Sequence, residues 1–242
     1  MQSIDLLRLQ AHRWGLALDA GQTEGLVRYA RLLAGYREAN VIGARDPDVV
    51  LLDHILDSLS CFLSKPLWET TSLIDVGSGG GLPGVAIGLV RPETSITLVE
   101  ATQKKVRFLA RVVGELSLAR VEILNARVEE AARWTGQRGE YEVATARALA
   151  RLAVVAEYCV PLLRVGGYVI SMKGRLDGAE LDEGRRAART VGAKVDDVIR
   201  VPLLTEVGEK VRHLVILRKT RETPPEYPRR VGIPARRPLG VV

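Results

Sequence analysis

A glycine-rich turn between two short apolar strands is the feature of this sequence that most directly indicates chemistry. Residues 74–76 are strand-like, residues 77–81 are glycine apart from one serine, and a later strand, 96–99, ends on the acid Glu100. Folds that hold nucleoside cofactors share this order, because glycines let the backbone approach the ligand and the acid accepts hydrogen bonds from ribose hydroxyls. The sequence therefore predicts a nucleoside-cofactor site. Two alternatives remain: the turn holds no ligand, or Glu100 caps the following helix.

The turn fits two cofactor motifs. An NAD-type G-x-G-x-x-G starts at Gly79, whereas an S-adenosylmethionine-type D-x-G-x-G-x-G starts at Asp75 and continues through Gly77, Gly79 and Gly81. The second is favoured, because the carboxylate of Asp75 can organise the turn and reach the methionine end of the cofactor. Pro83 at the helix start suits the N1 position but is unusual where a pyrophosphate must rest on free backbone N–H groups. We therefore expect S-adenosylmethionine.

Residues that follow three later strands are further candidates, since the carboxyl ends of parallel strands form the ligand crevice. After strand 121–124, the backbone of Val128 and the side chain of Glu129 could pair with the adenine edge, although this is also an ordinary helix start. Arg147 could hold the cofactor's carboxylate or the O6/N7 edge of a guanine, or it could pair with a surface acid. Lys173 could meet a phosphate or remain solvated.

The fourth strand end lacks two motifs of base methylation. Residues 144–149 contain neither the [DN]-P-P-[YFW] tetrapeptide that grips an exocyclic amine nor a cysteine for attack on a pyrimidine ring. Adenine-N6, cytosine-N4 and cytosine-C5 chemistry are therefore disfavoured. Methylation of a ring nitrogen such as guanine N7 needs no general base, so positioning and electrostatics suffice. Arg147 and Lys173 would position such a substrate.

The elements that must position these residues alternate between strand and helix. Strands are expected at 73–76, 96–99, 121–124, 141–146 and 167–172, with helices at 82–90, 103–117, 128–134, 151–164 and 177–191. This alternation predicts a doubly wound, mostly parallel α/β sheet. Two late strands, 195–201 and 212–218, should form an antiparallel hairpin, which completes a seven-stranded, Rossmann-like methyltransferase sheet. We expect a helical region over 1–66, with Pro66 ending its third helix, a methyltransferase domain over 67–219 and an arm over 220–242.

Composition and charge limit the class of protein. The 242 residues are 47% hydrophobic, and no apolar run approaches the roughly 20 residues of a membrane span. Cys61 and Cys159 sit in no metal or redox spacing, so we expect reduced, inert thiols in a cytoplasmic protein without a metal. Five of the six net positive charges lie at 218–242. Five prolines should prevent regular structure there, and the segment is either an arm for phosphate contacts or a frayed terminus.

The assembled motifs resemble the glucose-inhibited division protein B family over nearly the whole chain. The matching stretches include residues 45–47, 54–58, 74–84, 105–109, 127–129, 146–148, 173–174, 212–214 and 227–234. The resemblance implies a guanine-N7 methyltransferase of small-subunit (16S) ribosomal RNA. It also implies cofactor contacts, which fall at Gly77, Leu82, Glu100, Ala101, Thr102, Val128, Glu129 and Arg147.

The expected partner is small-subunit ribosomal RNA or an assembling small subunit, and the expected state is a monomer with no membrane attachment. His54 and Asp57 lie three apart on a helix and are interpreted as a structural hydrogen-bonding pair. Lys104, Lys105 and Arg107 could join Arg212 and His213 in a basic rim around the site, or form a solvated face. Two other functions stay open: an NAD-dependent oxidoreductase, and an RNA-binding module with a vestigial cofactor fold.

Overall fold

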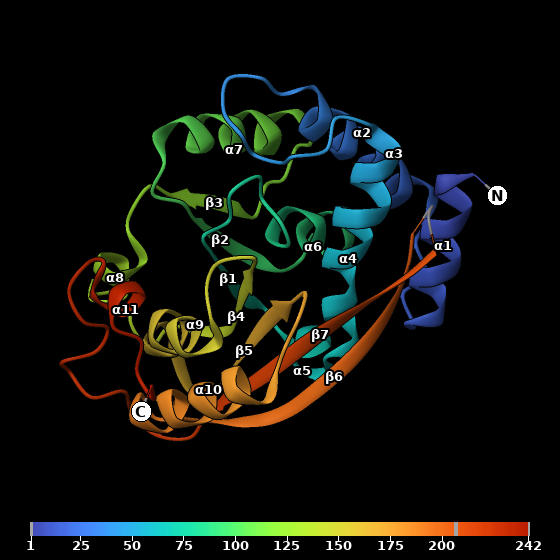
Figure 1. Cartoon of the computed structure of the whole chain (residues 1–242). Coiled ribbons are helices and arrows are strands. Elements are labelled where there is room, and N and C mark those ends of the chain that lie inside the picture. The colour runs from blue at the N-terminus through green and yellow to red at the C-terminus, as the bar shows by residue number, and fades with distance from the viewer. Residues whose placement is uncertain (1, 206–207, 242) are drawn as a thin grey trace.

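A seven-stranded sheet forms the centre of the computed structural model, which describes residues 2–205 and 208–241 (Figure 1). The strand order is β3-β2-β1-β4-β5-β7-β6. Strands β1 to β5 are parallel, and β7 runs antiparallel to both β5 and β6. The strands are β1 Ser72–Val76, β2 Ser95–Val99, β3 Val121–Leu124, β4 Tyr141–Arg147, β5 Leu163–Lys173, β6 Ala193–Thr205 and β7 Gly208–Lys219. The predicted α/β methyltransferase-like sheet is confirmed. The strand order reverses between β1 and β4, and this topological switch point is where such folds bind ligands.

Helices enclose the sheet on both faces. They are α1 Ser3–Arg13, α2 Ala20–Gly35, α3 Pro47–Val50, α4 Asp57–Leu59, α5 Lys65–Glu69, α6 Gly84–Val90, α7 Gln103–Glu115, α8 Val128–Ala131, α9 Leu152–Cys159, α10 Gly178–Thr190 and α11 Ile233–Arg236. Neighbouring residues of a strand point to opposite faces. Accordingly Leu73 packs in the core shared with the N-terminal helices and α6, whereas Ile74 packs in the core shared with α9 and α10.

The third predicted helix of the N-terminal region is divided into segments of different helical pitch. After α3 the chain makes a π-helical stretch, Leu51–Leu56, then α4 and a 3-10 turn, Ser60–Leu63. Pro66 does not end this helix, because it lies within the first turn of α5. A proline is tolerated there, since the N–H that it lacks would have no partner within the helix.

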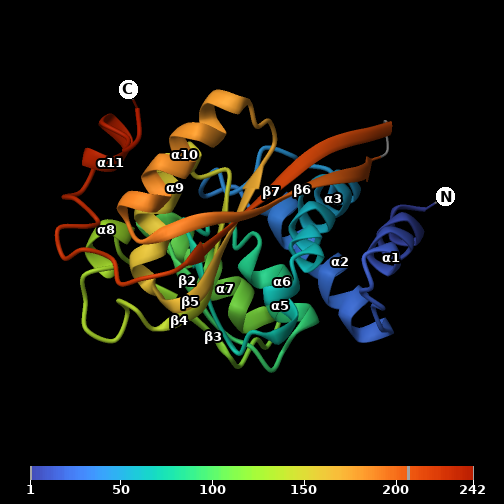
Figure 2. The same cartoon turned by 90° about the horizontal axis from the view of Figure 1, so that it is seen from below.

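The predicted hairpin is longer than the sequence indicated, and the end nearest its turn pairs with no other strand of the sheet among the described residues. Strand β5 pairs with β7 only over residues 213–218, so the part of the hairpin nearest its turn extends past β5. Figures 1 and 2 show this extension lying beside α1. The Nζ atom of Lys210 lies 2.6 Å from Oδ2 of Asp53, which links the hairpin to the N-terminal helices.

The end of α9 was placed too late by the sequence. The helix stops at Cys159, a 3-10 turn follows over Val160–Leu162, and β5 begins at Leu163 rather than at residue 167. Pro161 explains the early stop, because proline has no N–H for the helical hydrogen bond and clashes with the preceding turn.

The C-terminal residues are folded onto the domain. They pass from β7 along α8, α9 and α10 (Figure 1), and they include the short helix α11. The expectation that prolines prevent regular structure was therefore wrong at α11, where Pro234 occupies the first turn. The alternative of a frayed terminus was also wrong for the described residues, because Thr223 and Pro228 are buried.

Both cysteines, Cys61 and Cys159, are free thiols in fully buried positions. Burial raises the pKa of each thiol, so both remain protonated and unreactive, as predicted. Across residues 2–205 and 208–241, no helix has the length and apolar character needed to cross a membrane.

Candidate cofactor and acceptor site

The turn after β1 requires glycine for both conformation and space. Gly77, Gly79 and Gly81 have φ angles of +70°, +58° and +94°, in the left-handed region that other residues rarely adopt. A Cβ atom on Gly77 would lie 2.5 Å from Cδ1 of Leu149, which packs over the turn from the loop after β4. Glycine at position 77 therefore leaves room for Leu149, and close approach of a ligand to the turn stays a prediction.

Glu100, at the end of β2, braces this turn. Its Oε2 atom accepts a hydrogen bond from the backbone N–H of Gly79 at 3.0 Å, and Oε1 accepts one from Thr102 at 2.7 Å. Each carboxylate oxygen has a second lone pair, so the side chain retains the capacity to accept ribose hydroxyls. The bond to Gly79 is an organising role that the sequence did not predict. The bond to Thr102, the N-cap residue of α7, agrees with the alternative that Glu100 caps the following helix, and the ribose-binding role stays a prediction.

Asp75 organises the start of α6 from inside the sheet. The side chain is fully buried, with Oδ2 accepting from the N–H of Gly84 at 3.3 Å and Oδ1 accepting from the hydroxyl of Thr145 at 2.8 Å. Burial raises the pKa of this carboxyl group from 3.8 to about 6. The sequence placed Pro83 at the N1 position of this helix, but α6 begins one residue later, at Gly84, and Pro83 is its N-cap residue. The organising half of the prediction for Asp75 is confirmed.

A pocket of about 370 Å³ lies at the carboxyl ends of β1, β2 and β3, and we call it the glycine-turn pocket. It is lined by Gly77, Val99, Glu100, Ala101, Thr102, Lys105, Ala126, Arg127, Val128, Glu129, Ala148, Leu149, Ala150, Tyr158 and Ala235. Six of the sequence-predicted cofactor residues are therefore brought together: Gly77, Glu100, Ala101, Thr102, Val128 and Glu129. The others, Asp75, Gly79, Leu82 and Arg147, do not line it, and Leu82 packs in the core.

Glu129 lines this pocket and is buried. Its Oε1 atom accepts hydrogen bonds from the hydroxyl of Tyr158 at 3.1 Å and from the backbone N–H of Gly232 at 2.9 Å. The Oε2 atom takes part in neither bond. Glu129 is thus held in one orientation by two donors, a condition for specific recognition of a ligand edge.

A second pocket, of about 220 Å³, adjoins the first and is called the Arg147 pocket. Its lining residues are Asp57, Arg147, Ala148, Met172, Lys173, Gly174, Arg212, His213 and Leu214. Ala148 lines both pockets and has a φ angle of +51°, which is rare for a residue with a side chain. Such strained backbone is concentrated at functional sites. A second, smaller space therefore lies next to the glycine-turn pocket and shares Ala148 with it.

Arg147 is held by two side chains of the N-terminal helices. Its Nε atom donates to Oδ2 of Asp57 at 3.0 Å, and Nη2 lies 2.9 Å from Nδ1 of His54. Burial and the positive charge of Arg147 lower the pKa of His54 to about 4, so the imidazole is neutral at pH 7 and can accept the bond. The sequence interpretation of His54 and Asp57 as a structural pair missed that both bind Arg147. The acid that pairs with Arg147 is also buried, not at the surface.

Asp57 lies between two guanidinium groups, because Nε of Arg212 is 3.5 Å from its Oδ1 atom. Within the described residues, that oxygen and Nδ1 of His213 are buried without a hydrogen-bond partner. Both residues line the Arg147 pocket. Buried polar atoms without partners are costly in a folded protein, so these two atoms are candidates for contacts with a ligand.

Lys173 ties the end of β5 to two neighbouring elements. Its Nζ atom donates to the carbonyl of Ala150 at 2.8 Å and lies 2.7 Å from Oε1 of Glu180. The same oxygen of Glu180 accepts from the N–H of Leu152, at the start of α9. Lys173 therefore lines the Arg147 pocket but is not a solvated lysine, and its charge is neutralised by Glu180.

The predicted basic rim is only partly formed, because Lys104 and Arg107 line neither pocket. Lys105 lines the glycine-turn pocket, and Arg212 and His213 line the Arg147 pocket. Several lining residues were not predicted, among them Tyr158 and Ala235. No local pattern marks these two, since they come from the last turn of α9 and from the C-terminal segment.

Comparisons with known proteins agree with this geometry. Residues 22–214 match the GidB family, described as rRNA small subunit methyltransferase G. The protein named ribosomal RNA small subunit methyltransferase G from Rubrobacter xylanophilus is 51% identical over 97% of this chain and 90% of its own length. Its namesake from Roseiflexus sp. (strain RS-1) is 42% identical over 98% of this chain and 100% of its own length.

Solved structures with low sequence identity share the fold. Fibrillarin from Methanococcus jannaschii, a pre-rRNA processing protein, gives a TM-score of 0.51 at 12% identity, over 65% of this chain and 70% of that one. Cofactor-bound Rv0187 from MTB also gives a TM-score of 0.51, at 16% identity, over 84% of this chain and 92% of that one. The family model matches residues 22–214, and one relative is 51% identical over 97% of this chain. The chain therefore belongs to the GidB family of rRNA small subunit methyltransferases.

Proposed function

We propose that this protein transfers a methyl group from S-adenosylmethionine to N7 of a guanine in small-subunit ribosomal RNA. The observation that carries the proposal is the pair of adjoining pockets that share Ala148, in a chain of the rRNA small subunit methyltransferase G family. One pocket suits a nucleoside cofactor, and the other has a fixed cation. When bound, S-adenosylmethionine supplies an electrophilic methyl group on a sulfonium centre.

The glycine-turn pocket has the groups that this cofactor requires. Gly77 lines the pocket, and Glu100 offers acceptor capacity for ribose hydroxyls. Glu129 and the backbone of Val128 can pair with the adenine edge. Asp75 would act from below by holding the turn in shape, because its side chain is fully buried.

The Arg147 pocket suits a base with acceptor atoms on one edge. A guanidinium can donate to the O6 atom of a guanine, and Asp57 with His54 fixes the direction of Arg147. The N7 atom carries an in-plane lone pair without a proton, so the reaction requires orientation and charge stabilisation but no general base. Lys173 would support this pocket by holding the loop after β4 through Ala150.

The proposed partner is small-subunit ribosomal RNA, either naked or in an assembling subunit, and the proposed state is a cytoplasmic monomer. The net charge of +6 favours a polyanionic partner. Exposed arginines near the site, Arg230, Arg236 and Arg237, supply part of that charge. Binding should therefore weaken as the salt concentration rises.

A methyl-transfer assay tests this proposal. Labelled S-adenosylmethionine is incubated with naked small-subunit RNA and with assembled subunits, and the product is located by cleavage chemistry specific for 7-methylguanine. One labelled guanine is expected. No incorporation into either substrate would contradict the proposal. A calorimetric titration distinguishes this proposal from an NAD-dependent oxidoreductase. Tight binding of NADH without binding of S-adenosylhomocysteine would indicate the oxidoreductase.

A further inference from the structure

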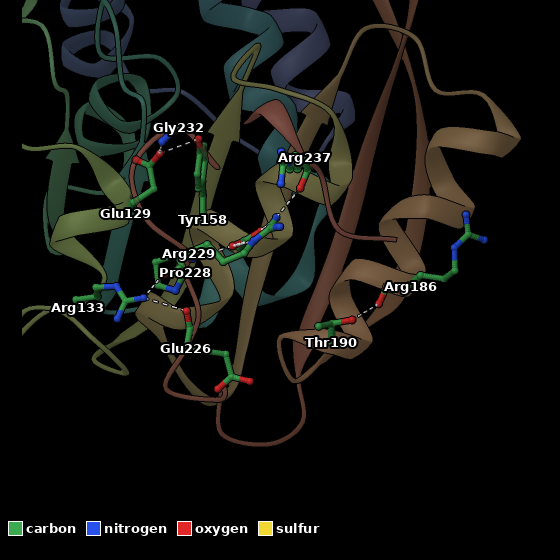
Figure 3. Close-up of polar contacts among 11 residues, drawn as sticks. Glu129, Arg133, Tyr158, Arg186, Thr190, Glu226, Pro228, Arg229, Gly232 and Arg237 are labelled. Atoms are coloured by element: carbon green, nitrogen blue, oxygen red, sulfur yellow. Dashed lines mark hydrogen bonds and ion pairs between the residues drawn. The ribbon is translucent and has the colours of Figure 1, made fainter. Parts of the chain in front are cut away.

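The C-terminal segment, residues 220–241, reaches the glycine-turn pocket at two points. The backbone N–H of Gly232 donates to Oε1 of Glu129 at 2.9 Å, as Figure 3 shows. Three residues further on, Ala235 of α11 lines the pocket itself. Residues more than a hundred positions from Glu129 in the sequence are therefore part of the pocket that Glu129 closes.

A buried ion pair fastens this part of the segment. Glu157, on α9, is fully buried, and its Oε1 atom accepts from both the backbone N–H and Nε of Arg229, each at 2.8 Å. Its Oε2 atom accepts from Nη2 of Arg229 at 2.6 Å. A buried carboxylate without such partners is strongly unfavourable, so Glu157 requires Arg229 in place. The same Nη2 atom donates to the carbonyl of Arg237 at 2.7 Å, which closes the loop that carries Gly232 and Ala235 (Figure 3).

Two arginines that follow α8 hold the preceding part of the segment. Arg138 donates to the carbonyls of Tyr227 at 2.8 Å and Thr223 at 3.0 Å. Arg133 donates to the carbonyl of Glu226 at 2.9 Å and to that of Pro228 (Figure 3). Glu129 belongs to α8, so these bonds tie the segment to the part of the chain that carries Glu129.

We infer that the C-terminal segment is a wall of the cofactor pocket and that Arg229 is a positioning residue that holds this wall against Glu129. The inference rests on the proposed function in one respect, namely that S-adenosylmethionine occupies the glycine-turn pocket. Without the segment, Glu129 loses one of the two donors that orient it, and the pocket opens at Ala235. The segment should therefore determine cofactor affinity, although its residues lie outside the methyltransferase core.

Two variants separate the wall from the ion pair. Arg229→Gln removes the ion pair and should release the part of the segment that carries Gly232 and Ala235, whereas Arg133 and Arg138 still hold the part before it. A chain that ends after Ile233 keeps Arg229, Glu157 and the N–H of Gly232 but lacks Ala235. We expect the dissociation constant of S-adenosylhomocysteine, measured by calorimetry, to rise about tenfold for Arg229→Gln and about fivefold for the shortened chain. Arg229→Lys should recover part of the loss, because lysine can still pair with Glu157.

A charge-matched control keeps the segment in place. The shortened chain loses Arg236 and Arg237, whose side chains are exposed. The double variant Arg236→Gln/Arg237→Gln loses the same charge, and its affinity for S-adenosylhomocysteine should stay within about twofold of the original chain. Kinetics give a second readout: with saturating RNA, KM for S-adenosylmethionine should rise in the two segment variants more than kcat falls.

The outcomes distinguish the inference from the proposed function. If the original chain binds S-adenosylhomocysteine and the shortened chain binds it equally well, the inference is overturned and the proposed function stands. A lower melting temperature with unchanged affinity and KM would also overturn it, since the segment would then be only structural. If the original chain does not bind S-adenosylhomocysteine, the proposed function fails and the inference falls with it. Should Arg229→Gln not fold, the shortened chain decides.

Discussion

The Nε atom of Arg147 donates to Oδ2 of Asp57 at 3.0 Å, across ninety positions of the sequence. Asp57 begins α4, in the N-terminal helical region, and Arg147 ends β4, at the centre of the sheet. His54 contacts the same guanidinium from the preceding helical turn. The N-terminal helices therefore set the direction of the cation that faces the proposed acceptor, and the helical region is part of the site.

Replacement of Arg147 by lysine tests whether direction matters as well as charge. Lysine keeps the positive charge beside Asp57 but cannot donate to Asp57 and His54 from a planar group. We expect methyl transfer to fall about 100-fold, the loss that follows a misplacement of about 1 Å. The free energy of unfolding, measured in urea, should change much less than it does for Arg147→Ala, which leaves the buried Asp57 with only Arg212 nearby.

Arg164→Lys is the matched control for that change. Arg164 pairs with Glu142 at the start of β5, far along the strand from Lys173 and both pockets, and its side chain is exposed. Its replacement should leave methyl transfer unchanged. If Arg147→Lys also keeps full turnover, the two contacts of Arg147 have no role in orienting the acceptor.

Glu100→Gln should weaken cofactor binding. The carboxylate accepts two backbone N–H groups, of Gly79 and Thr102, one on each oxygen. Glutamine offers only one acceptor oxygen, so one N–H loses a bond to a charged group, worth about 1.5–3 kcal/mol. The dissociation constant of S-adenosylhomocysteine should rise about tenfold or more by calorimetry. Glu122→Gln, at an exposed position of β3, serves as control, and equal affinities for the two variants would remove Glu100 from the site.

Tyr29→Phe tests whether helix α2 supports the glycine turn. The hydroxyl of Tyr29 is buried and donates to the carbonyl of Gly80 at 2.6 Å. Phenylalanine fills the same space but leaves that carbonyl without its donor, which should lower the free energy of unfolding by about 1–3 kcal/mol. Cofactor affinity should fall too, because the turn loses a constraint. Tyr168→Phe in β5 is the control, and stability equal to that control would show that this bond contributes nothing.

The buried carboxyl of Asp75 predicts a pH dependence of stability. Its pKa is about 6 in the folded protein and 3.8 as the ordinary value. Between these values the folded state holds a proton that the unfolded chain has released, so stability falls as pH rises from about 4 to about 6 and is constant above that. At 1.36 kcal/mol per pKa unit the change is about 3 kcal/mol.

Asp75→Asn removes this titration while keeping an acceptor for Gly84 and a group that can bond Thr145. The difference in unfolding free energy between the original chain and the variant, from urea titrations at pH 4 and pH 7, should therefore shift by about 3 kcal/mol in favour of the variant at pH 7. A difference independent of pH would show that Asp75 ionises normally in the folded state.

Local patterns were sufficient to predict the sheet and its glycine turn. The alternation of strands and helices, the glycines after Val76 and the acid at Glu100 are all encoded in short windows of sequence. The end of α9 was misplaced because the apolar run continues past Cys159, and only Pro161 marks the change. The helical start at Pro66 was missed because a proline can end one helix or begin the next.

Long-range pairs could not be predicted from the sequence. Arg229 was assigned to a basic arm, yet it neutralises Glu157, which is buried in α9. Lys219 was likewise counted with the arm but is buried, with Nζ donating to the carbonyl of Leu163. A charge in a sequence does not show whether its partner is water, RNA or a residue that folding brings near. The same limit hid the contact of Asp57 with Arg147.

The central claim is that the methyl group is transferred to N7 of a guanine, and replacement of that one atom in the RNA tests it. Small-subunit RNA is transcribed with 7-deazaguanosine in place of guanosine, so that a C–H group replaces every N7 lone pair. Both transcripts are offered with labelled S-adenosylmethionine, as naked RNA and after assembly with small-subunit proteins. We predict that the normal RNA is methylated and the 7-deaza RNA is not. Equal incorporation into both would contradict transfer to guanine N7.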